Sequence, residues 1–305
     1  MERRRLGASG PEISVIGYGA WEAGGTSWGP NESDEAVVDA IRSALDAGID
    51  WIDTAEVYGV GASERLVGRA IAGRRDDVVI ATKVGDRPDG TGFRPDEVAR
   101  ACDRSLERLG VDHIDLYQVH WKGDVPVEET WGAMAALQDA GKARWIGVSN
   151  YEREDIERCL AERHVDSLQP EFSMLDRTNA ELIRWCGERG IGVVSYGPLA
   201  YGMLTGRFTR DDIGRFGDWR DEQTEGVFAP DAVERNLAAV ERLRGIAERL
   251  GATTGQVALA WNVRQPGVTS AIAGSRSRGH IRENAEAGSL QLDDATVAEI
   301  DALLD

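Results

Sequence analysis

The sequence has few cysteines and no long hydrophobic run. Its three cysteines, Cys102, Cys159 and Cys186, include no Cys-x-x-Cys pair, and each lies in a segment with helical spacing. A disulfide framework or a zinc site is therefore not indicated. No stretch approaches the ~18 uninterrupted apolar residues of a membrane span, and the charged residues 1–7 lead into no apolar run of a secretory signal. These absences predict a reduced, cytoplasmic protein.

Basic residues are also scarce relative to acidic ones. The chain has 35 Lys+Arg against 53 Asp+Glu over 305 residues, a net charge of −18. Proteins that bind nucleic acid or an anionic membrane rely on a surplus of Lys and Arg, so we expect neither partner and favour a small molecule. The 42% of hydrophobic residues is enough for a large core.

A third absence concerns glycine. No Gly-x-Gly-x-x-Gly occurs, and the nearest segment, Gly59–Glu64, ends in glutamate and follows the second predicted strand. An open dinucleotide-binding sheet places that motif after its first strand. The sequence therefore argues against such a sheet.

Short β-rich runs alternate with amphipathic segments along the whole chain. Strand-like runs, rich in Val, Ile, Trp and Tyr, are Val15–Ala20, Asp50–Ala55, Val78–Val84, Ile114–Trp121, Ala143–Asn150, Ser167–Ser173, Gly192–Leu199 and Thr269–Ser275. Helical spacing is found in Glu35–Ala47, Pro95–Leu109, Val127–Ala140, Arg153–Ala161, Asn179–Arg189 and Ala232–Leu250.

This alternation predicts an α/β fold, a (β/α)8 TIM barrel that forms one domain over residues 1–305. Gly7, Gly10 and Pro11 between β-like ends predict an N-terminal β-hairpin within Arg4–Ser14. A long loop follows the seventh strand, and its part 211–230 mixes acids with glycine without a clean period. Its role stays open.

The carboxyl ends of three consecutive predicted strands carry chemically active side chains. They are Asp53, Lys83 and His120, and Tyr58 follows five residues after Asp53. Singly, these residues have ordinary explanations, such as a helix cap or a solvated lysine. Active sites of such barrels lie at this rim, and a nearby ammonium favours a phenolate. We therefore expect a partly buried Lys83, held by Asp53, to shift the pKa of Tyr58 toward that of a general acid, with His120 holding a substrate oxygen.

The same residues resemble the signatures of the aldo-keto reductase family. Gly48–Gly59, followed by Ser63-Glu64, is similar to the first signature, and Thr82-Lys83 and Val119-His120-Trp121 are similar to its other catalytic positions. The resemblance covers essentially the whole chain. It implies that Tyr58 donates the proton, that Lys83 and Asp53 tune its pKa, and that His120 orients a carbonyl while a nicotinamide supplies hydride.

The remaining strand ends suit a nicotinamide cofactor. Ser149, Asn150 and Gln169 offer the donors and acceptors that a carboxamide needs, and Tyr196 offers a flat face. The resemblance implies these roles. It extends cofactor binding to further positions: Gly19, Ala20, Trp21, Asp53, Gly197 and Leu199.

A basic segment stands out in this acidic chain. Gly274–Arg282 contains three arginines and one histidine and no acid, which is typical of a phosphate site. The resemblance implies that Ser275 and Arg276 bind an adenosine 2′-phosphate. It also implies that Glu283 and Asn284 lie near the adenine and that Arg207 contacts the pyrophosphate. Gly274 replaces the lysine of many members and His280 their arginine, so NADPH is expected and NADH is possible.

Trp21, Trp28 and Trp121 are predicted to form a substrate wall together with Tyr58 and His120. Such a wall suits apolar or flat carbonyl compounds, or the faces of sugars, and the sequence does not decide between them. The helical tryptophans, Trp131, Trp185 and Trp261, are expected in the core.

The leading hypothesis is a reversible, NADPH-dependent oxidoreductase that reduces an aldehyde or ketone without a metal. One alternative is a nucleotide-binding regulatory subunit with little turnover. Another is a lyase or aldolase that uses Lys83 as a Schiff base. A short-chain-dehydrogenase site is disfavoured because Tyr117 lies five residues before Lys122 rather than four. The sequence leaves the oligomeric state open, with a monomer favoured.

Overall fold

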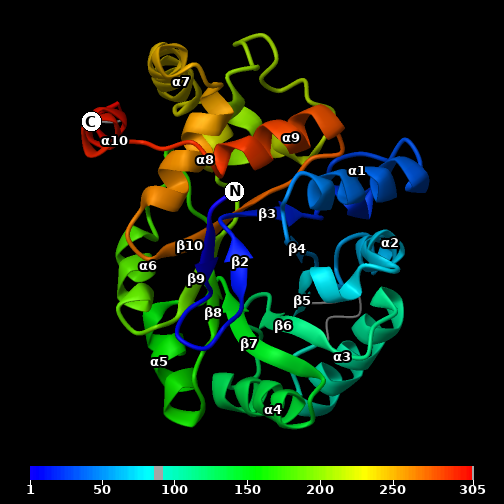
Figure 1. The fold of residues 1–305 in the computed structure, drawn as a ribbon. Coiled ribbons are helices and arrows are strands. Elements are labelled where there is room, and N and C mark those ends of the chain that lie inside the picture. The colour runs from blue at the N-terminus through cyan, green and yellow to red at the C-terminus, as the bar shows by residue number, and fades with distance from the viewer. Residues whose placement is uncertain (86–91, 304–305) are drawn as a thin grey trace.

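The centre of the computed structural model, which describes residues 1–85 and 92–303, is a closed barrel of parallel strands surrounded by helices (Figure 1). The strand order is β10-β3-β4-β5-β6-β7-β8-β9, and β10 closes the barrel by pairing with both β3 and β9. The bounds are β3 Ile16–Gly19, β4 Trp51–Asp53, β5 Val79–Val84, β6 Ile114–Val119, β7 Ala143–Ser149, β8 Ser167–Gln169, β9 Gly192–Ser195 and β10 Val268–Ala273. The predicted (β/α)8 barrel is confirmed.

Each predicted strand overlaps one strand of the barrel, and two of them were predicted four residues too long at the carboxyl end. The β8 ladder ends at Gln169, since Pro170 has no N–H to donate. The run predicted to continue to Leu199 ends at Ser195, because Gly197 has a φ of 66° and Pro198 follows it.

The helices pack around the outside of the barrel. They are α1 Asp34–Asp46, α2 Ala62–Ile71, α3 Pro95–Leu109, α4 Val127–Asp139, α5 Arg153–Glu162, α6 Ala180–Gly187, α7 Val233–Leu250, α8 Thr254–Arg264, α9 Arg278–Ala287 and α10 Asp294–Asp301. In α1, the Ser33 side chain accepts the Ala36 N–H at 3.1 Å, which starts the helix. Its apolar stripe of Val37, Ile41 and Ala44 is fully buried. None of the described helices is long and apolar enough to cross a membrane.

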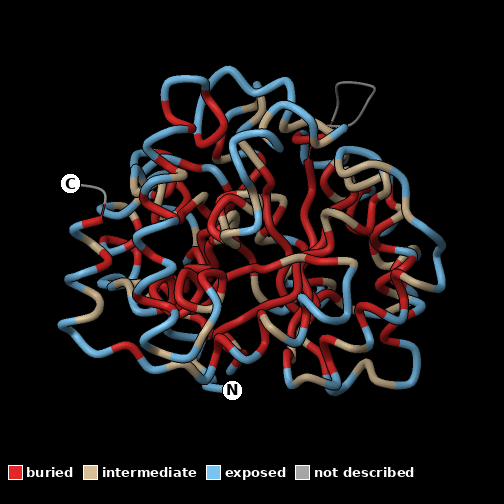
Figure 2. Tube along the Cα trace, turned by 90° about the horizontal axis from the view of Figure 1, so that it is seen from above, coloured by how far each residue is buried: buried red, intermediate tan, exposed pale blue. Residues whose placement is uncertain are grey.

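The predicted N-terminal hairpin is present as β1 Arg3–Arg5 and β2 Glu12–Ser14, paired antiparallel. Its flanking Leu6 and central Ile13 are buried in one cluster with Trp51, Leu116 and Val194, which come from the barrel strands. The hairpin therefore closes the end of the barrel where the strands begin. Buried residues fill the centre of the molecule when it is seen from above, and the N-terminus lies at the lower edge of that view (Figure 2).

The long loop after β9 folds back over the opposite rim as three short 3-10 turns, η3 Ala200–Thr205, η4 Trp219–Glu222 and η5 Gly226–Phe228. Arg220 organises it: its guanidinium pairs with Asp218 at 2.6 Å, donates to the Tyr201 carbonyl at 3.1 Å and lies over the Phe216 ring. The sequence predicted no such order, because ion pairing and ring contacts, rather than a periodic pattern, hold this segment.

Candidate active site

Alternation along the strands builds the site in layers. Trp51, Ala81 and Leu116 face the interior in the apolar cluster above the hairpin. Since side chains two residues apart share a face, Asp53 and Lys83 follow in the next layer toward the carboxyl rim. The predicted residues are thereby brought together.

Lys83 is completely buried and forms the centre of the site. Its Nζ donates to Asp53 Oδ2 at 2.5 Å, to the Thr54 carbonyl at 2.9 Å and to Tyr58 Oη at 3.4 Å. Burial lowers the pKa of Lys83, and the Asp53 carboxylate opposes that shift. The expectation of a partly buried lysine was wrong. All three ammonium protons have acceptors, an arrangement that disfavours a Schiff-base role.

Tyr58 does not titrate as the sequence suggested. Burial raises its pKa well above 10, and the Asp53 carboxylate raises it further. The predicted shift toward the phenolate is therefore wrong for this arrangement: the Lys83 charge is matched by Asp53, and the desolvated phenolate is unfavourable. Tyr58 consequently remains a protonated donor at neutral pH.

His120 lies beside this group, with its ring edge-on to Tyr58 at 5.7 Å between centroids. Its backbone N–H is bonded to the Val84 carbonyl at 2.8 Å, and Trp121 packs on its ring at 4.0 Å. Burial, and then the Lys83 charge, lower the pKa of His120 well below 6.5. The imidazole is therefore neutral near pH 7, and the residue lines the cleft.

The turn after Tyr58 depends on glycine. Gly59 has a φ of 60°, and a Cβ there would lie 2.1 Å from the Gly24 carbonyl oxygen. The loop after β4 therefore packs directly on the turn after β3, where the 3-10 helix η1 spans Glu22–Gly24. This contact explains why glycine follows the tyrosine.

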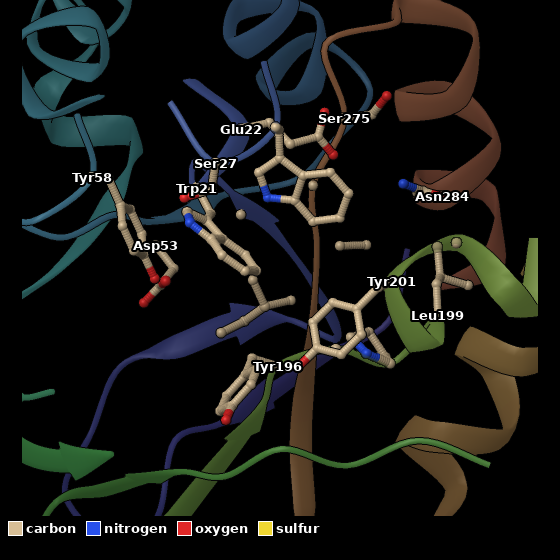
Figure 3. Close-up of a pocket in the computed structure, with 18 of the residues that line it drawn as sticks. Trp21, Glu22, Ser27, Asp53, Tyr58, Tyr196, Leu199, Tyr201, Ser275 and Asn284 are labelled. Atoms are coloured by element: carbon tan, nitrogen blue, oxygen red, sulfur yellow. The ribbon is translucent and has the colours of Figure 1, made fainter. Parts of the chain in front are cut away.

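A cleft of about 770 Å³ begins at Tyr58 and His120 and runs to the N-terminal part of α9. Figure 3 shows Tyr58 and Asp53 at one side, Ser275 and Asn284 at the other, and Trp21 between them. The predicted residues that line it are Gly19, Trp21, Trp28, Asp53, Tyr58, His120, Trp121, Ser149, Asn150, Gln169, Tyr196, Gly197, Leu199, Arg207, Ser275, Arg276, Glu283 and Asn284. Ala20 does not line it, because it is buried with its backbone bonded to Asp53 and Ser63.

The polar residues of the cleft floor form one network. Gln169 Nε2 donates to Asp53 Oδ1 at 2.8 Å, and Ser149 Oγ donates to the Gln169 carbonyl at 2.8 Å. Asn150 Nδ2 donates to the His120 carbonyl at 3.0 Å, while Tyr196 Oη donates to Asn150 Oδ1 at 2.9 Å. These bonds fix the amide planes beside the reactive group.

The far end of the cleft carries the basic segment. Arg207 pairs with Glu283 at 2.7 Å and contacts His280. A Cβ at Gly274 would lie 2.7 Å from the Gly19 carbonyl oxygen, so this backbone excludes the lysine that the resemblance leads one to expect. Arg276 is bonded to carbonyl oxygens of the loop between β3 and α1.

An aromatic wall covers the cleft. Trp21 packs edge-on against Trp28 at 5.3 Å and lies beside Trp219 at 5.4 Å, and Tyr201 meets Trp219 at 4.9 Å. Trp219, which packs on this wall, was not predicted. Lining residues that were not predicted include Glu22, Tyr201, Asp218 and Arg220. For Glu22, the sequence offered one signal, its position directly after the predicted residue Trp21.

The remaining predictions concern the core. Trp131 and Trp261 are buried as expected, and Trp185 is mostly buried with Arg153 and Arg189 over its ring. The three cysteines are free and buried in helices. Within residues 1–85 and 92–303, no cluster of three His, Cys, Asp or Glu is arranged to hold a metal.

The fold and the site together define a barrel enzyme with a protonated phenol, a buried ion pair and a neutral imidazole at one end of a long cleft. A sequence model described as the Aldo/keto reductase family matches residues 15–305. The chain belongs to the aldo/keto reductase family, and it is an oxidoreductase of the class that acts on carbonyl and alcohol groups.

Individual proteins match over almost their full length. The chain is 36% identical to the aldo-keto reductase YhdN of Bacillus subtilis, covering 100% of this chain and 94% of the relative. A glycerol dehydrogenase from Gluconobacter oxydans superposes with a TM-score of 0.89 at 32% identity, covering 99% and 94% of the two chains. An aldo/keto reductase from Klebsiella pneumoniae in complex with NADP and acetate gives 0.77 at 31% identity, covering 99% and 96%.

Proposed function

We propose that the protein reduces an aldehyde or ketone to the alcohol, with hydride from NADPH and the proton from Tyr58. The observation that carries this proposal is the Tyr58 phenol, which burial keeps protonated 3.4 Å from the Lys83 ammonium. It stands beside His120 where the cleft begins. The reaction is reversible, and NADH is a possible second cofactor.

The chain's own residues move and stabilise the proton. Tyr58 gives its proton to the developing alkoxide, and the ammonium of Lys83 then stabilises the phenolate that remains. Asp53, 2.5 Å from Lys83 Nζ, keeps that ammonium charged despite its burial. The neutral His120 orients the carbonyl oxygen. This division of roles matches the family pattern that the sequence resembles.

The cleft fits a dinucleotide. It is long, and its floor near Tyr58 offers the polar groups of Ser149, Asn150 and Gln169 beside the flat ring of Tyr196. We propose that these four residues hold the nicotinamide, which supplies hydride when bound. Support comes from the Klebsiella relative of the same fold, which was solved with NADP.

The rest of the cofactor is assigned to the other predicted positions along the cleft. We propose that Gly19, Trp21, Asp53, Gly197 and Leu199 continue the nicotinamide end. The pyrophosphate and adenosine are assigned to a second group of residues: Arg207, Ser275, Arg276, Glu283 and Asn284. The assignment is supported by Figure 3, in which Asp53 lies at one side of the cleft and Ser275 and Asn284 lie at the other.

The substrate is proposed to be a small carbonyl compound bound against Trp21, Trp28 and Trp121, which line the cleft near Tyr58 and His120. We propose a cytoplasmic monomer that binds neither nucleic acid nor membrane, in keeping with its acidic composition.

The test is NADPH oxidation by the wild type with a panel of aldehydes and ketones, repeated with Tyr58→Phe. The variant should lose about 10²- to 10⁴-fold in kcat, the usual contribution of a general acid, and keep its affinity for NADPH. Tyr151→Phe removes another buried tyrosine hydroxyl, one outside the cleft, and should retain activity. Full activity of Tyr58→Phe would rule out Tyr58 as the donor. Tight NADPH binding without turnover by the wild type would instead favour the regulatory-subunit hypothesis.

A further inference from the structure

Arg276 connects two parts of the cleft that the sequence analysis treated separately. It lies in the connection from β10 to α9, yet its side chain reaches the loop between β3 and α1. Nη2 donates to the Trp28 carbonyl at 2.8 Å, and Nη1 donates to the Pro30 and Gly29 carbonyls at 2.9 and 3.2 Å. One guanidinium therefore holds three consecutive backbone carbonyls.

The loop that Arg276 holds carries part of the substrate wall. The Trp28 ring packs edge-on against Trp21 at 5.3 Å and Trp219 at 5.6 Å. The segment from Gly25 to Ser33 forms no helix or strand, so its position depends on side-chain contacts. One other tie is Asn31, which donates to the Ala23 carbonyl at 2.9 Å. Removing the Arg276 side chain would leave the Trp28 backbone without its bond to the barrel.

The same guanidinium has limited capacity for an anion. Arginine has five N–H groups on three nitrogen atoms. In Arg276, two of these nitrogens, Nη1 and Nη2, already donate to the loop carbonyls. Its Nε lies 3.7 Å from the Glu22 carboxylate, so a phosphate approaching that edge would meet a negative charge. A phosphate that engages Arg276 fully must therefore draw the side chain away from the loop or displace Glu22.

We infer that Arg276 is a positioning residue for the Trp28 side of the carbonyl pocket, and that this loop and a cofactor 2′-phosphate share its guanidinium. The kinetic part of the inference rests on the proposed function; the structural part does not. A residue that binds only phosphate matters only with NADPH. A residue that positions Trp28 also matters with NADH, which has no 2′-phosphate.

Steady-state kinetics with both cofactors separate these roles in Arg276→Ala. With NADH, we expect KM for an aromatic aldehyde to rise about tenfold, the scale for losing part of an apolar pocket contact, while kcat changes little. Arg276→Lys restores a point charge for phosphate but not the planar fork. It should recover part of the NADPH affinity while KM for the aldehyde stays high.

The matched control is Arg42→Ala. Arg42 also ties two elements through backbone carbonyls, donating to Ala70 and Arg69 at 3.3 and 3.1 Å, but it lies outside the cleft. Both KM values should be unchanged in this variant. If Arg276→Ala raises only the KM for NADPH and leaves the aldehyde KM with NADH unchanged, the positioning role is overturned.

A second measurement needs no turnover and so separates failure of this inference from failure of the proposed function. Acrylamide quenching of Trp28 is obtained as the difference between each protein and its Trp28→Phe counterpart, without cofactor. We expect greater quenching in Arg276→Ala than in the wild type and Arg42→Ala. In the wild type, adenosine 2′,5′-bisphosphate should increase the quenching, whereas adenosine 5′-monophosphate should not. Equal quenching in all proteins would contradict the positioning role, and equal effects of the two nucleotides would contradict the sharing.

Discussion

The charged residues of the site, Lys83 and Asp53, are buried away from water next to Tyr58. Lys83 is buried but retains three acceptors, and its partner Asp53 is nearly as buried. The pair carries no net charge, so it does not lower the pKa of Tyr58, and the phenol keeps its proton before the substrate binds. It can still stabilise the phenolate once the proton has moved, because the Lys83 ammonium lies 3.4 Å from the phenol oxygen. The site therefore holds a donor ready rather than an ionised base.

His120 provides a pH-dependent test at this scale. Its pKa in the folded protein is well below 6.5, whereas in the unfolded chain it is about 6.5. Below that pH the unfolded state binds a proton that the folded state does not, so the free energy of unfolding falls as pH falls. The slope from this residue is at most about 1.4 kcal/mol per pH unit.

Urea unfolding of the wild type and His120→Asn between pH 7.5 and 5.5 measures this slope. The variant should lose less stability over that range, since it lacks the buried imidazole. Parallel stability curves for the two proteins would show that His120 is not held neutral by the fold.

The four reactive residues were predictable because strand ends in a parallel barrel meet at one rim. Lys83 and His120 could be read from the ends of their predicted strands, and Tyr58 from its distance to Asp53. The direction in which the pKa of Tyr58 shifts could not be predicted, since it depends on how completely the phenol and the neighbouring ion pair are buried. Nor could the bonds of Arg276 to the loop at residues 28–30, which join positions about 250 apart in the chain.

Among the elements, strands were more predictable than the loop that covers them. The strand runs are dense in β-branched and aromatic residues, which are typical of parallel strands buried on both faces. Helices α2, α8, α9 and α10 were not predicted. Helix α2 begins one residue after Gly61, in a segment read as part of a signature. The segment from Asp218 to Arg220 was missed because ion pairing and ring contacts, not periodicity, determine its structure.

The hairpin offers a test of how the barrel is closed. Leu6 is 1% exposed and belongs to the apolar cluster above the hairpin, together with Trp51 and Val194. Leu6→Ala should lower the free energy of unfolding by about 2–5 kcal/mol, the usual range for a buried leucine. Because the site lies at the opposite rim, kcat and KM of the folded variant should match the wild type. A variant of wild-type stability would show that the hairpin is dispensable for closing the barrel.

For the whole molecule, the acidic composition describes the surface more than the site. The net charge is −18, yet the cleft is lined by arginines as well as acids, including Arg207, Arg220 and Arg276. Each of these arginines is paired with a carboxylate or lies near one. Positive charge is thus retained where an anionic cofactor would bind, while most of the acid excess lies elsewhere.

The proposal of one domain and one chain has a direct consequence. Thermal unfolding should show a single transition, and NADPH should raise its midpoint. At a concentration 100-fold above its Kd, a ligand that binds only the folded state adds about 2.7 kcal/mol. Light scattering after gel filtration should give a mass near 33.2 kDa. Two resolved transitions, or twice that mass, would contradict the proposal.

Deuterium transfer tests the central claim most directly. The wild type is incubated with an aldehyde and NADPH carrying deuterium at C4 of the nicotinamide, on the face from which hydride leaves, and the product alcohol is analysed by mass spectrometry. The account predicts one deuterium on the carbinol carbon, formed at a rate that falls sharply in Tyr58→Phe. An alcohol without deuterium from either C4-labelled form of NADPH, or no alcohol from any carbonyl tested, would contradict it.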